Sequence, residues 1–559
     1  MKNSILLFFV LIIFGCTSPK KEKVDLIVHN AIVYTVDSSF TTAESFAIKD
    51  GKIIAVGKND SILAKYEGEK LDAQGKAVFP GLIDAHCHFY SYGLGLKKID
   101  LVGTKSFDEV IQRVIEFSKT NHPDWIQGRG WDQNNWAVKE FPDRKKLDSL
   151  FPNTPVFLTR IDGHAALVNG EALRRAGITG YKEIDGGAVE IRDEYRESIF
   201  IPIEGLSGML IDNAVDLVAK IIPTASKPEA RAALLAAQKN CFAVGLTTVD
   251  DAGLEKQIVD LMDEMQKNSE LKMRVYAMLT DNKENLDYYL QHGIYKTDRL
   301  NVRSFKFYAD GALGSRGACL LQDYSDKKGW KGFLLSNMDT LMSKSGDIFL
   351  HEFQMNTHCI GDSAVRLILL LYNSIFNHDD TIRQIDSRWR IEHFQITTKS
   401  DIEELKNGWI IPSVQPTHAT SDMYWAKDRL GAERIKYAYA YKDLLKAAGM
   451  VALGTDFPVE NINPMYTFYA AVARKDLKGF PKDGFQMENA LTREETLKGM
   501  TIWAAYANFE EKEKGSIEKG KFADFVILDK DIMKINIDEV PNVKVVSTFV
   551  NGEKVYSSK

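Results

Sequence analysis

The chain has 559 residues, of which 45% are hydrophobic and 26% are charged. These values are typical of a folded globular protein, and 39 Gly with 15 Pro are too few for a fibrous or disordered chain. Lys and Arg number 71 against 77 Asp and Glu, a net charge of -6, which argues against broad electrostatic binding of nucleic acid. Five cysteines in a chain of this length exclude a disulfide framework.

The first residues have the pattern of a secretory signal. Lys2 precedes the apolar run 5–14, and Gly15-Cys16 follows it. A cysteine directly after the cleavage point is similar to a bacterial lipoprotein signal, in which Cys16 becomes the lipidated N-terminus. We therefore expect residues 1–23 to be a signal peptide and tether that anchors the protein to the bacterial cell envelope, on the periplasmic or extracellular side. The alternative is an uncleaved anchor or a buried start of the fold, although the run is too short to span a bilayer as a mature helix.

Short β-rich runs follow the tether and recur at the far end of the chain. They occupy residues 24–77 and 508–559, and Asp50-Gly51 and Asn551-Gly552 supply hairpin turns. Neither region contains a cluster of catalytic residue types. We expect the two ends to pair into one small composite β-sandwich domain.

Between these ends, strand-like runs alternate with helical stretches, which is the pattern of βα units in a parallel sheet. Eight runs stand out, at residues 78–88, 245–250, 273–279, 304–309, 354–359, 388–394, 409–414 and 450–456. Eight is the number that closes a (β/α)₈ TIM barrel, so we predict an α/β fold with the barrel at residues 78–507. The interval between the first two runs is too long for a βα connection and predicts an inserted subdomain at about 100–235.

Polar side chains stand at the downstream ends of these runs, where barrel enzymes place their chemistry. The first run ends with His86 and His88, which strand alternation puts on one face. The fifth, sixth and eighth runs end with His358, His393 and Asp456. A single strand histidine is more often a hydrogen-bonded core residue, but four histidines and an aspartate at matching strand ends predict a divalent metal site.

Six motifs and a C-terminal segment carry a family resemblance. They are, in order, GLIDAHCHF, FKFYADGALGSRGA, THCIGD, RIEHFQ, SVQP and GTDFPVE, followed by GSIEKGKFADFVILD. They resemble the metal-dependent amidohydrolase superfamily and, within it, the YtcJ-like branch that includes N-substituted formamide deformylase. The resemblance covers essentially the whole mature chain. It implies a (β/α)₈ barrel, a composite β-domain and hydrolysis of a carbon–nitrogen bond by metal-activated water.

The same resemblance assigns roles to the residues at the strand ends. It makes His86 and His88 the metal ligands of the first strand, His358 and His393 those of the fifth and sixth, and Asp456 the acid/base at the eighth. The alternative for Asp456 is a helix N-cap that follows the strand.

Lys306, on the fourth run, matches the position where many relatives carry a carboxylated lysine that bridges two metals. A neutral buried lysine can take up CO₂, and the resulting carbamate is an anionic ligand. The alternative is an unmodified lysine that pairs with Asp310 or with a substrate carboxylate. The expected cofactor is a divalent metal, with Zn²⁺ favoured, as one or two ions.

The insertion carries two segments, GWDQ at 130–133 and RIDGH at 160–164, that match the YtcJ-like branch. They make Trp131 and Asp162 candidate substrate contacts and His164 a candidate catalytic group that polarises a carbonyl. The alternative for Trp131 is packing within the insertion. Arg316, just past the fourth run, either meets an anionic substrate group or forms a surface ion pair. His418 has no assigned role.

These observations favour a metal-dependent hydrolase that cleaves an amide, N-acyl or N-formyl bond of a small molecule, with an aspartate as acid/base. Two alternatives remain: a cyclic amidase or deaminase on the same site, and a non-catalytic, lipid-anchored protein that binds metal or solute. Asp456 favours catalysis, because a binding protein needs no acid/base. Beyond the substrate and the membrane, no nucleic-acid partner is expected, and a homodimer is among the assemblies that the sequence allows.

Overall fold

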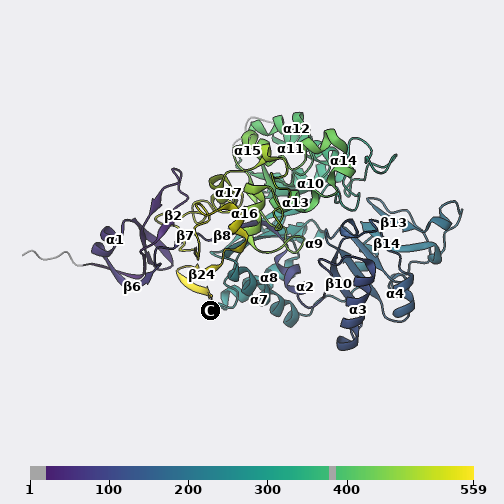
Figure 1. The fold of residues 1–559 in the computed structure, drawn as a ribbon, viewed down its shortest axis with the longest axis horizontal. Helices are drawn as coiled ribbons and strands as arrows, with labels where there is room; N and C mark the ends of the chain where they lie inside the picture. Colours follow the sequence, from purple (N-terminus) through teal and green to yellow (C-terminus); the bar gives the residue numbers. More distant parts are fainter. Residues whose placement is uncertain (1–20, 377–384, 559) are drawn as a thin grey trace, which may run out of the picture.

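A computed structural model describes residues 21–376 and 385–558. The predicted signal peptide and Cys16 lie outside these residues. Three bodies of secondary structure are visible in Figure 1: a barrel in the middle, a β-domain with α1 (Asn59–Lys65) on one side, and the insertion on the other. Among the described residues, no helix combines the length and apolar character needed to cross a bilayer.

Eight parallel strands form the barrel, and they follow one another around it in chain order. They are β8 (Leu82–Cys87), β15 (Leu246–Leu254), β16 (Arg274–Thr280), β18 (Leu300–Tyr308), β19 (Gln354–Cys359), β20 (Trp389–His393), β21 (Ile410–Val414) and β22 (Ala452–Leu453). Each corresponds to one predicted run, so the barrel prediction is confirmed. A short strand, β17 (Tyr295–Lys296), pairs antiparallel with β18.

The ring closes just beyond the last strand. The backbone N of Asp456 donates to His86 O, and the backbone N of His88 donates to Phe457 O, both at 2.8 Å. The carboxyl ends of the first and eighth strands are therefore joined directly. Because His86, His88 and Asp456 are themselves predicted site residues, the contacts that close the barrel also bring the site residues together.

Helices follow or precede the barrel strands along the chain. They are α2 (Phe89–Gly95), α7 (Lys227–Ala243), α8 (Lys256–Lys267), α9 (Lys283–His292), α10 (Met338–Leu350), α11 (Asp362–Phe376), α12 (Lys399–Glu403), α13 (Pro416–Asp422), α14 (Ala426–Arg434), α15 (Tyr441–Ala448), α16 (Pro464–Ala473), α17 (Arg493–Gly499) and α18 (Ile502–Ala507).

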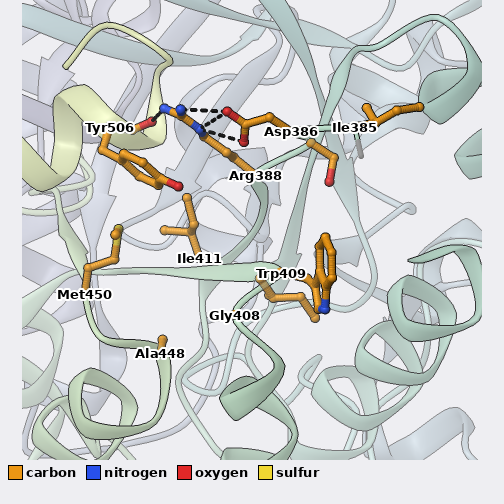
Figure 2. A pocket seen from close by; sticks show the side chains of 11 residues that line it. Ile385, Asp386, Arg388, Gly408, Trp409, Ile411, Ala448, Met450 and Tyr506 are labelled. Atoms are coloured by element: carbon orange, nitrogen blue, oxygen red, sulfur yellow. Dashed lines mark hydrogen bonds and ion pairs between the residues drawn. The ribbon is translucent and has the colours of Figure 1, made fainter. Parts of the chain in front are cut away.

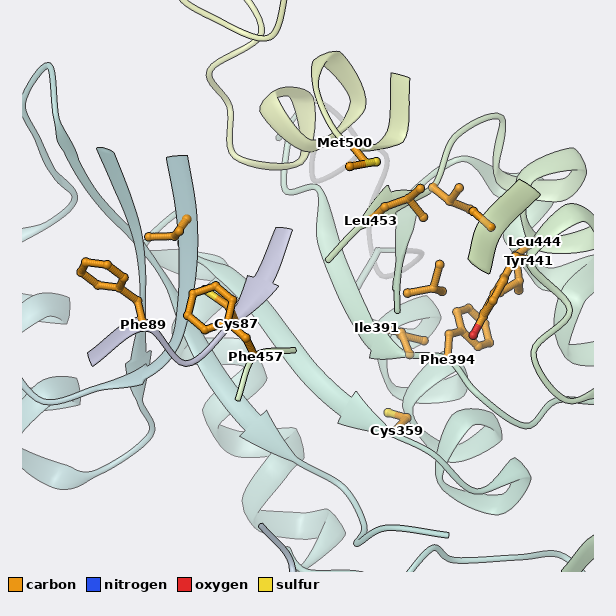
Figure 3. Packing of buried hydrophobic residues seen from close by; sticks show 14 of the residues in the cluster. Cys87, Phe89, Cys359, Ile391, Phe394, Tyr441, Leu444, Leu453, Phe457 and Met500 are labelled. Carbon is orange, nitrogen blue, oxygen red and sulfur yellow. The ribbon is translucent and has the colours of Figure 1, made fainter. Parts of the chain in front are cut away.

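The apolar layer under these helices contains side chains of the barrel strands, such as the alternating residues Val275, Ala277 and Leu279 of β16. Figure 3 shows Cys87, Ile391 and Leu453 in this layer, beside aromatic side chains that include Phe457. Strand alternation then turns the intervening residues, His86 among them, toward the barrel interior. The four cysteines of the described residues are free thiols, and Cys87 and Cys359 are buried.

The insertion is a six-stranded sheet with its own apolar core. Its order is β13-β14-β12-β11-β10-β9, formed by β9 (Ile99–Asp100), β10 (Ile126–Trp131), β11 (Val156–Arg160), β12 (Ala165–Val168), β13 (Gly187–Ile191) and β14 (Leu206–Asp212). The accompanying helices are α3 (Phe107–Asn121), α4 (Lys145–Leu150), α5 (Gly170–Arg175) and α6 (Asp216–Ala219). The next helix, α7, packs against α2 and β15 of the barrel.

Both ends of the chain contribute to the β-domain. Its four-stranded sheet has the order β5-β4-β1-β6, with β1 (Glu22–His29), β4 (Ser45–Lys49), β5 (Lys52–Gly57) and β6 (Tyr66–Asp72). Its six-stranded sheet has the order β25-β24-β23-β7-β2-β3, with β2 (Ile32–Tyr34), β3 (Thr42–Ala43), β7 (Ala77–Pro80), β23 (Phe525–Leu528), β24 (Val545–Val550) and β25 (Glu553–Ser557). The two sheets share an apolar core, and the composite sandwich is confirmed.

One predicted strand is divided in the structure. Residues 78–88 form the end of β7 in the sandwich and all of β8 in the barrel, and the chain passes from one sheet to the other at Gly81. A Cβ on Gly81 would lie 2.2 Å from Thr247 Oγ1, so no side chain fits there. Since both halves are apolar, their composition does not reveal the break.

Candidate metal centre

His86 and His88, at the end of β8, are each held by one ring nitrogen. Nδ1 of the fully buried His86 lies 2.6 Å from Glu392 Oε2, and Nδ1 of His88 lies 2.9 Å from Ala252 O. Both rings are thereby left with Nε2 for a ligand. Metal-binding histidines are commonly oriented in this way, by a hydrogen bond from the nitrogen that does not bind the metal.

Asp456, which follows the eighth strand, lies close to these two rings of the first strand. Its Oδ1 is 3.2 Å from His88 Nε2 and 3.8 Å from His86 Nε2. Its φ of 62° is uncommon for a residue other than glycine, and the backbone hydrogen bond to His86 O holds it there. Asp456 caps no helix, since the next helix, α16, has Asn463 as its N-cap.

The protonation states favour cation binding. Burial alone would raise the pKa of Asp456, but the neighbouring imidazoles of His88, His86 and His418 outweigh burial and hold that pKa below its ordinary value. Burial, reinforced by the nearby charge of Lys306, lowers the pKa of His86 to about 4. The aspartate is therefore ionised and His86 neutral, which are the forms that bind a metal.

Ligand atoms of His86, His88 and Asp456 lie within 4.8 Å of one another. Two imidazoles and a carboxylate are a common donor set for Zn²⁺ and similar ions. Asp456 Oδ1 is buried and has no hydrogen-bond partner within residues 21–376 and 385–558, so an oxygen is left to serve as a ligand. The residues present fit a divalent cation.

The predicted ligands of β19 and β20 lie beside this group. The ring of His393 is 4.8 Å from that of His86 and 4.4 Å from that of His358, measured between centroids. His393 Nδ1 is 2.8 Å from Gln415 Oε1, which again leaves Nε2. His358 instead turns Nε2 toward Gly311 O, at 3.5 Å.

His418 joins the site although the sequence assigns it no role. Ligand atoms of His393, His418 and Asp456 also lie within 4.8 Å of one another, so the structure holds a second possible ligand group. The available signal was its position, four residues after the end of the seventh strand at Val414 and two residues after the SVQP motif.

Lys306 is buried, and its Nζ lies 3.4 Å from His86 Nε2. Burial lowers the pKa of Lys306 to about 8, against the opposing charges of Glu392 and Asp456. The predicted alternative of a pair with Asp310 is not found, because that carboxylate accepts three backbone N–H groups instead. Lys306 is therefore close to the centre and easier to deprotonate than an exposed lysine.

A network of buried charged side chains fixes the ring of His86. Glu392 Oε2 contacts His86, and Arg390 Nε lies 2.6 Å from Glu392 Oε1. Arg390 also reaches Asp250 at 2.9 Å, and Asn508 donates to Asp250 at 2.6 Å. No sequence pattern indicated this network, although Arg390 and Glu392 both stand in the RIEHFQ motif.

His164 belongs to the insertion and lies at the carboxyl end of the barrel, beside His358. Its ring centroid lies 4.9 Å from that of His358, and its Nδ1 is 2.7 Å from Asp212 Oδ1. Burial alone would lower the pKa of His164, but the hydrogen bond and charge of Asp212 raise it above its ordinary value. Asp212 therefore favours the protonated form of His164, and the sequence did not indicate this partner.

The three candidate substrate contacts each have a partner within the protein. Trp131 is buried in the core of the insertion and donates from Nε1 to Leu158 O at 2.8 Å, in agreement with the packing alternative. Arg316 pairs with Asp326 at 2.8 Å, which corresponds to the ion-pair alternative. Asp162 pairs with Arg160 at 2.5 Å and accepts from His164 N at 3.1 Å, so it holds the loop that carries His164.

A pocket at the other end of the barrel is separate from this centre. It encloses about 280 Å³ between the amino ends of β20 and β21, and Figure 2 shows Arg388 and Trp409 in its lining. The ligand groups lie at the carboxyl ends of the strands. Barrel enzymes use the carboxyl end for chemistry, so the pocket is not the candidate site.

Comparisons with known proteins agree with the fold. The profile of the Amidohydrolase family matches residues 69–556. YtcJ of Bacillus subtilis (strain 168) is 29% identical over 537 residues, which cover 94% of this chain and 98% of YtcJ. N-substituted formamide deformylase of Arthrobacter pascens is 26% identical over 559 residues, which cover 94% of this chain and 97% of that protein.

Among solved structures, an uncharacterized metal-dependent hydrolase from Pyrococcus horikoshii OT3 has a TM-score of 0.72 and 26% identity, and the match covers 92% of this chain and 99% of that chain. The chain belongs to the amidohydrolase family, in its YtcJ-like branch, and is a metal-dependent hydrolase.

Proposed function

We propose that the protein hydrolyses a carbon–nitrogen bond of a small molecule, an amide of the N-acyl or N-formyl type, to an amine and a carboxylate. The observation that carries this proposal is the ionised carboxylate of Asp456, 3.2 Å from the ligand nitrogen of His88. An acid/base at that distance from a metal ligand is what hydrolysis requires and what storage of a metal does not. The similarity to a formamide deformylase supports the choice of bond.

Each residue has a definable part in such a reaction. A divalent cation, when bound, supplies Lewis-acid polarisation of the carbonyl and activation of a water molecule. Asp456 accepts the proton of the attacking water and returns it to the leaving nitrogen. His164, whose protonated form Asp212 favours, can donate a hydrogen bond to the carbonyl oxygen as negative charge develops there.

The first test is a substrate panel. Purified protein loaded with Zn²⁺ or Mn²⁺ is expected to release amine from one or more N-formyl or N-acyl amides, to lose this activity with a chelator, and to regain it with metal. Lactams and cyclic imines in the same panel distinguish linear amide hydrolysis from ring opening or deamination. A protein that holds metal yet hydrolyses none of these compounds would contradict the proposal and favour a binding protein.

We also propose that Lys306 is carboxylated. Its lowered pKa leaves part of the amine neutral, as carbamate formation requires, and Nζ lies 3.4 Å from His86 Nε2. The intact native mass is expected to exceed the sequence mass by one CO₂. Lys306→Ala is expected to lose one metal equivalent, with short carboxylates partly restoring activity. A bare amine alongside a full metal complement would rule out the carbamate but not hydrolysis.

From the sequence alone, we further propose that the mature protein is anchored to the cell envelope through lipid on Cys16. Cys16→Ser is expected to move the protein into the soluble fraction or to leave the precursor uncleaved. Cell fractionation and immunoblotting measure this directly. A Cys16→Ser protein that fractionates and is processed like its parent would show that lipidation is wrong.

A further inference from the structure

Arg129 lies in β10, where the insertion meets the barrel. Its Nη1 donates to Pro458 O at 2.5 Å, and its Nη2 donates to Ile161 O at 2.9 Å. Pro458 stands two residues after Asp456, and Ile161 stands three residues before His164. One guanidinium group therefore joins the two segments that carry the proposed catalytic groups, although these segments come from different parts of the chain.

Backbone carbonyl oxygens, and not a carboxylate, accept both of these hydrogen bonds. Burial lowers the pKa of Arg129, and the charges of Asp456 and Asp162 oppose this effect. The planar guanidinium directs its N–H groups along fixed directions, so it can reach two carbonyls at once, whereas a lysine has a single nitrogen. The contacts of Arg129 are thus those of a bridge between two backbone segments.

Ile161 and His164 belong to one short loop that is bonded within itself. The backbone N of Gly163 donates to Arg160 O at 3.1 Å, and the backbone N of His164 donates to Asp162 Oδ1, also at 3.1 Å. Because these bonds link successive residues, a shift of Ile161 would move the imidazole of His164 with it. The bond from the guanidinium to Ile161 therefore acts on the position of the histidine.

Glycines after the fourth strand seat two charged side chains of the insertion. A Cβ on Gly311 or Gly317 would lie 2.3 or 2.0 Å from Asp212 Oδ2, and a Cβ on Gly314 would lie 2.9 Å from Arg160 Nη1. No side chain fits at these distances, so the loop can approach the insertion only as glycine. These contacts fix the insertion against the loop after the fourth strand, and they do not involve the eighth strand.

We propose that Arg129 is a positioning residue for the hydrolytic reaction, which sets the separation of His164 and Asp456 by holding both of their segments. A misplacement of about 1 Å can cost ~10²-fold in rate, even when the change lies outside the reacting groups. The effect on rate rests on the proposed function. The effect on the two segments does not, so it can be measured without a substrate.

The first arm of the test is kinetic. Arg129→Ala is expected to keep the metal content and KM of the parent and to lower kcat by about 10²-fold. Guanidinium chloride, at concentrations that leave the parent folded, is expected to fill the space of the missing side chain and restore part of kcat. Sodium chloride of equal ionic strength should restore none. Arg192→Ala, which removes an insertion arginine paired with Asp143 at 2.6 Å, is the matched control and should respond to neither salt.

The second arm is amide hydrogen exchange of the full-length protein, followed by mass spectrometry. Peptides that contain Gly163 and His164, and peptides that contain Val459, whose backbone N donates to Asp456 O at 2.8 Å, are expected to exchange faster in Arg129→Ala. Guanidinium should slow this exchange again, and peptides of β1 should match the parent. If the alanine variant does not fold, Arg129→Lys keeps the charge but has one nitrogen in place of the fork, and should show smaller changes in the same peptides.

The two arms separate this proposal from amide hydrolysis itself. Exchange that is unchanged in both sets of peptides would overturn the proposal, whether or not a substrate is known. An Arg129→Ala protein with the kcat of the parent, or with a lower kcat that guanidinium leaves unaltered, would also overturn it. A parent that hydrolyses no amide, together with faster exchange in the variant, would refute the proposed reaction and leave Arg129 as the residue that positions the two segments.

Discussion

Replacing Asp456 by Asn is expected to lower turnover by about 10²-fold or more while most of the metal stays bound. Asparagine keeps the size of the side chain and one ligand oxygen, but it cannot accept a proton from water at neutral pH. The imidazoles of His86 and His88 remain in place through their bonds to Glu392 and Ala252. The measurement is kcat on a substrate of the parent, with metal content determined on the same preparation.

His393→Asn provides the contrast to this variant. It removes a ligand rather than a proton acceptor, so it should lose metal while the barrel remains folded. Equal turnover by Asp456→Asn and the parent would remove the aspartate from the mechanism. Loss of all metal from Asp456→Asn would instead make its role that of a ligand alone.

The largest expected effect on stability comes from Arg390. Its guanidinium lies between Asp250 and Glu392, and all three side chains are fully buried. Burial alone would raise the pKa of Glu392, but the charge of Arg390 and the hydrogen bond with His86 lower it to about 2. Arg390→Met would leave two buried carboxylates without their cation. We expect this change to reduce the free energy of unfolding by ~3–5 kcal/mol.

Urea unfolding of metal-free protein measures this loss without a contribution from bound ions. Arg388→Met is the matched control: it removes an arginine two residues earlier, whose partners Asp386 and Glu511 are partly exposed and can be hydrated. The control should therefore cost much less. Equal losses for the two variants would show that burial of the Arg390 network does not set its contribution.

Local pattern was sufficient to predict the strand ends. Because alternation and the direction of parallel strands are both encoded within a few residues, His86, His88, His393 and Asp456 could be placed together before any contact was known. The eight strands follow from the same periodicity. The strands and the residues at their ends were therefore predicted best, because their positions depend on local sequence more than on long-range contacts.

The missed residues depend on geometry that no local pattern encodes. Alternation assigns Glu392 and His393 to opposite faces, yet both reach the site because His393 has a φ of 70°. Asp212 meets His164 through the antiparallel register of β12 and β14, in which Ala165 pairs with Ile211. His418 depends on the direction of a helix after its strand. Each contact follows from a backbone turn or a long-range pairing.

The pairing of β7 with β23 has a consequence for how the protein is made. Phe525 pairs with Pro80, so the N-terminal strands leave the ribosome long before their partners exist. During that interval β7 has an open edge, which other chains can pair with. Folding of the barrel shortens the effective loop between the two strands and lowers the entropy cost of joining them. The sandwich is therefore the last part to be completed, and a nascent or C-terminally truncated chain exposes an aggregation-prone edge that the finished protein conceals.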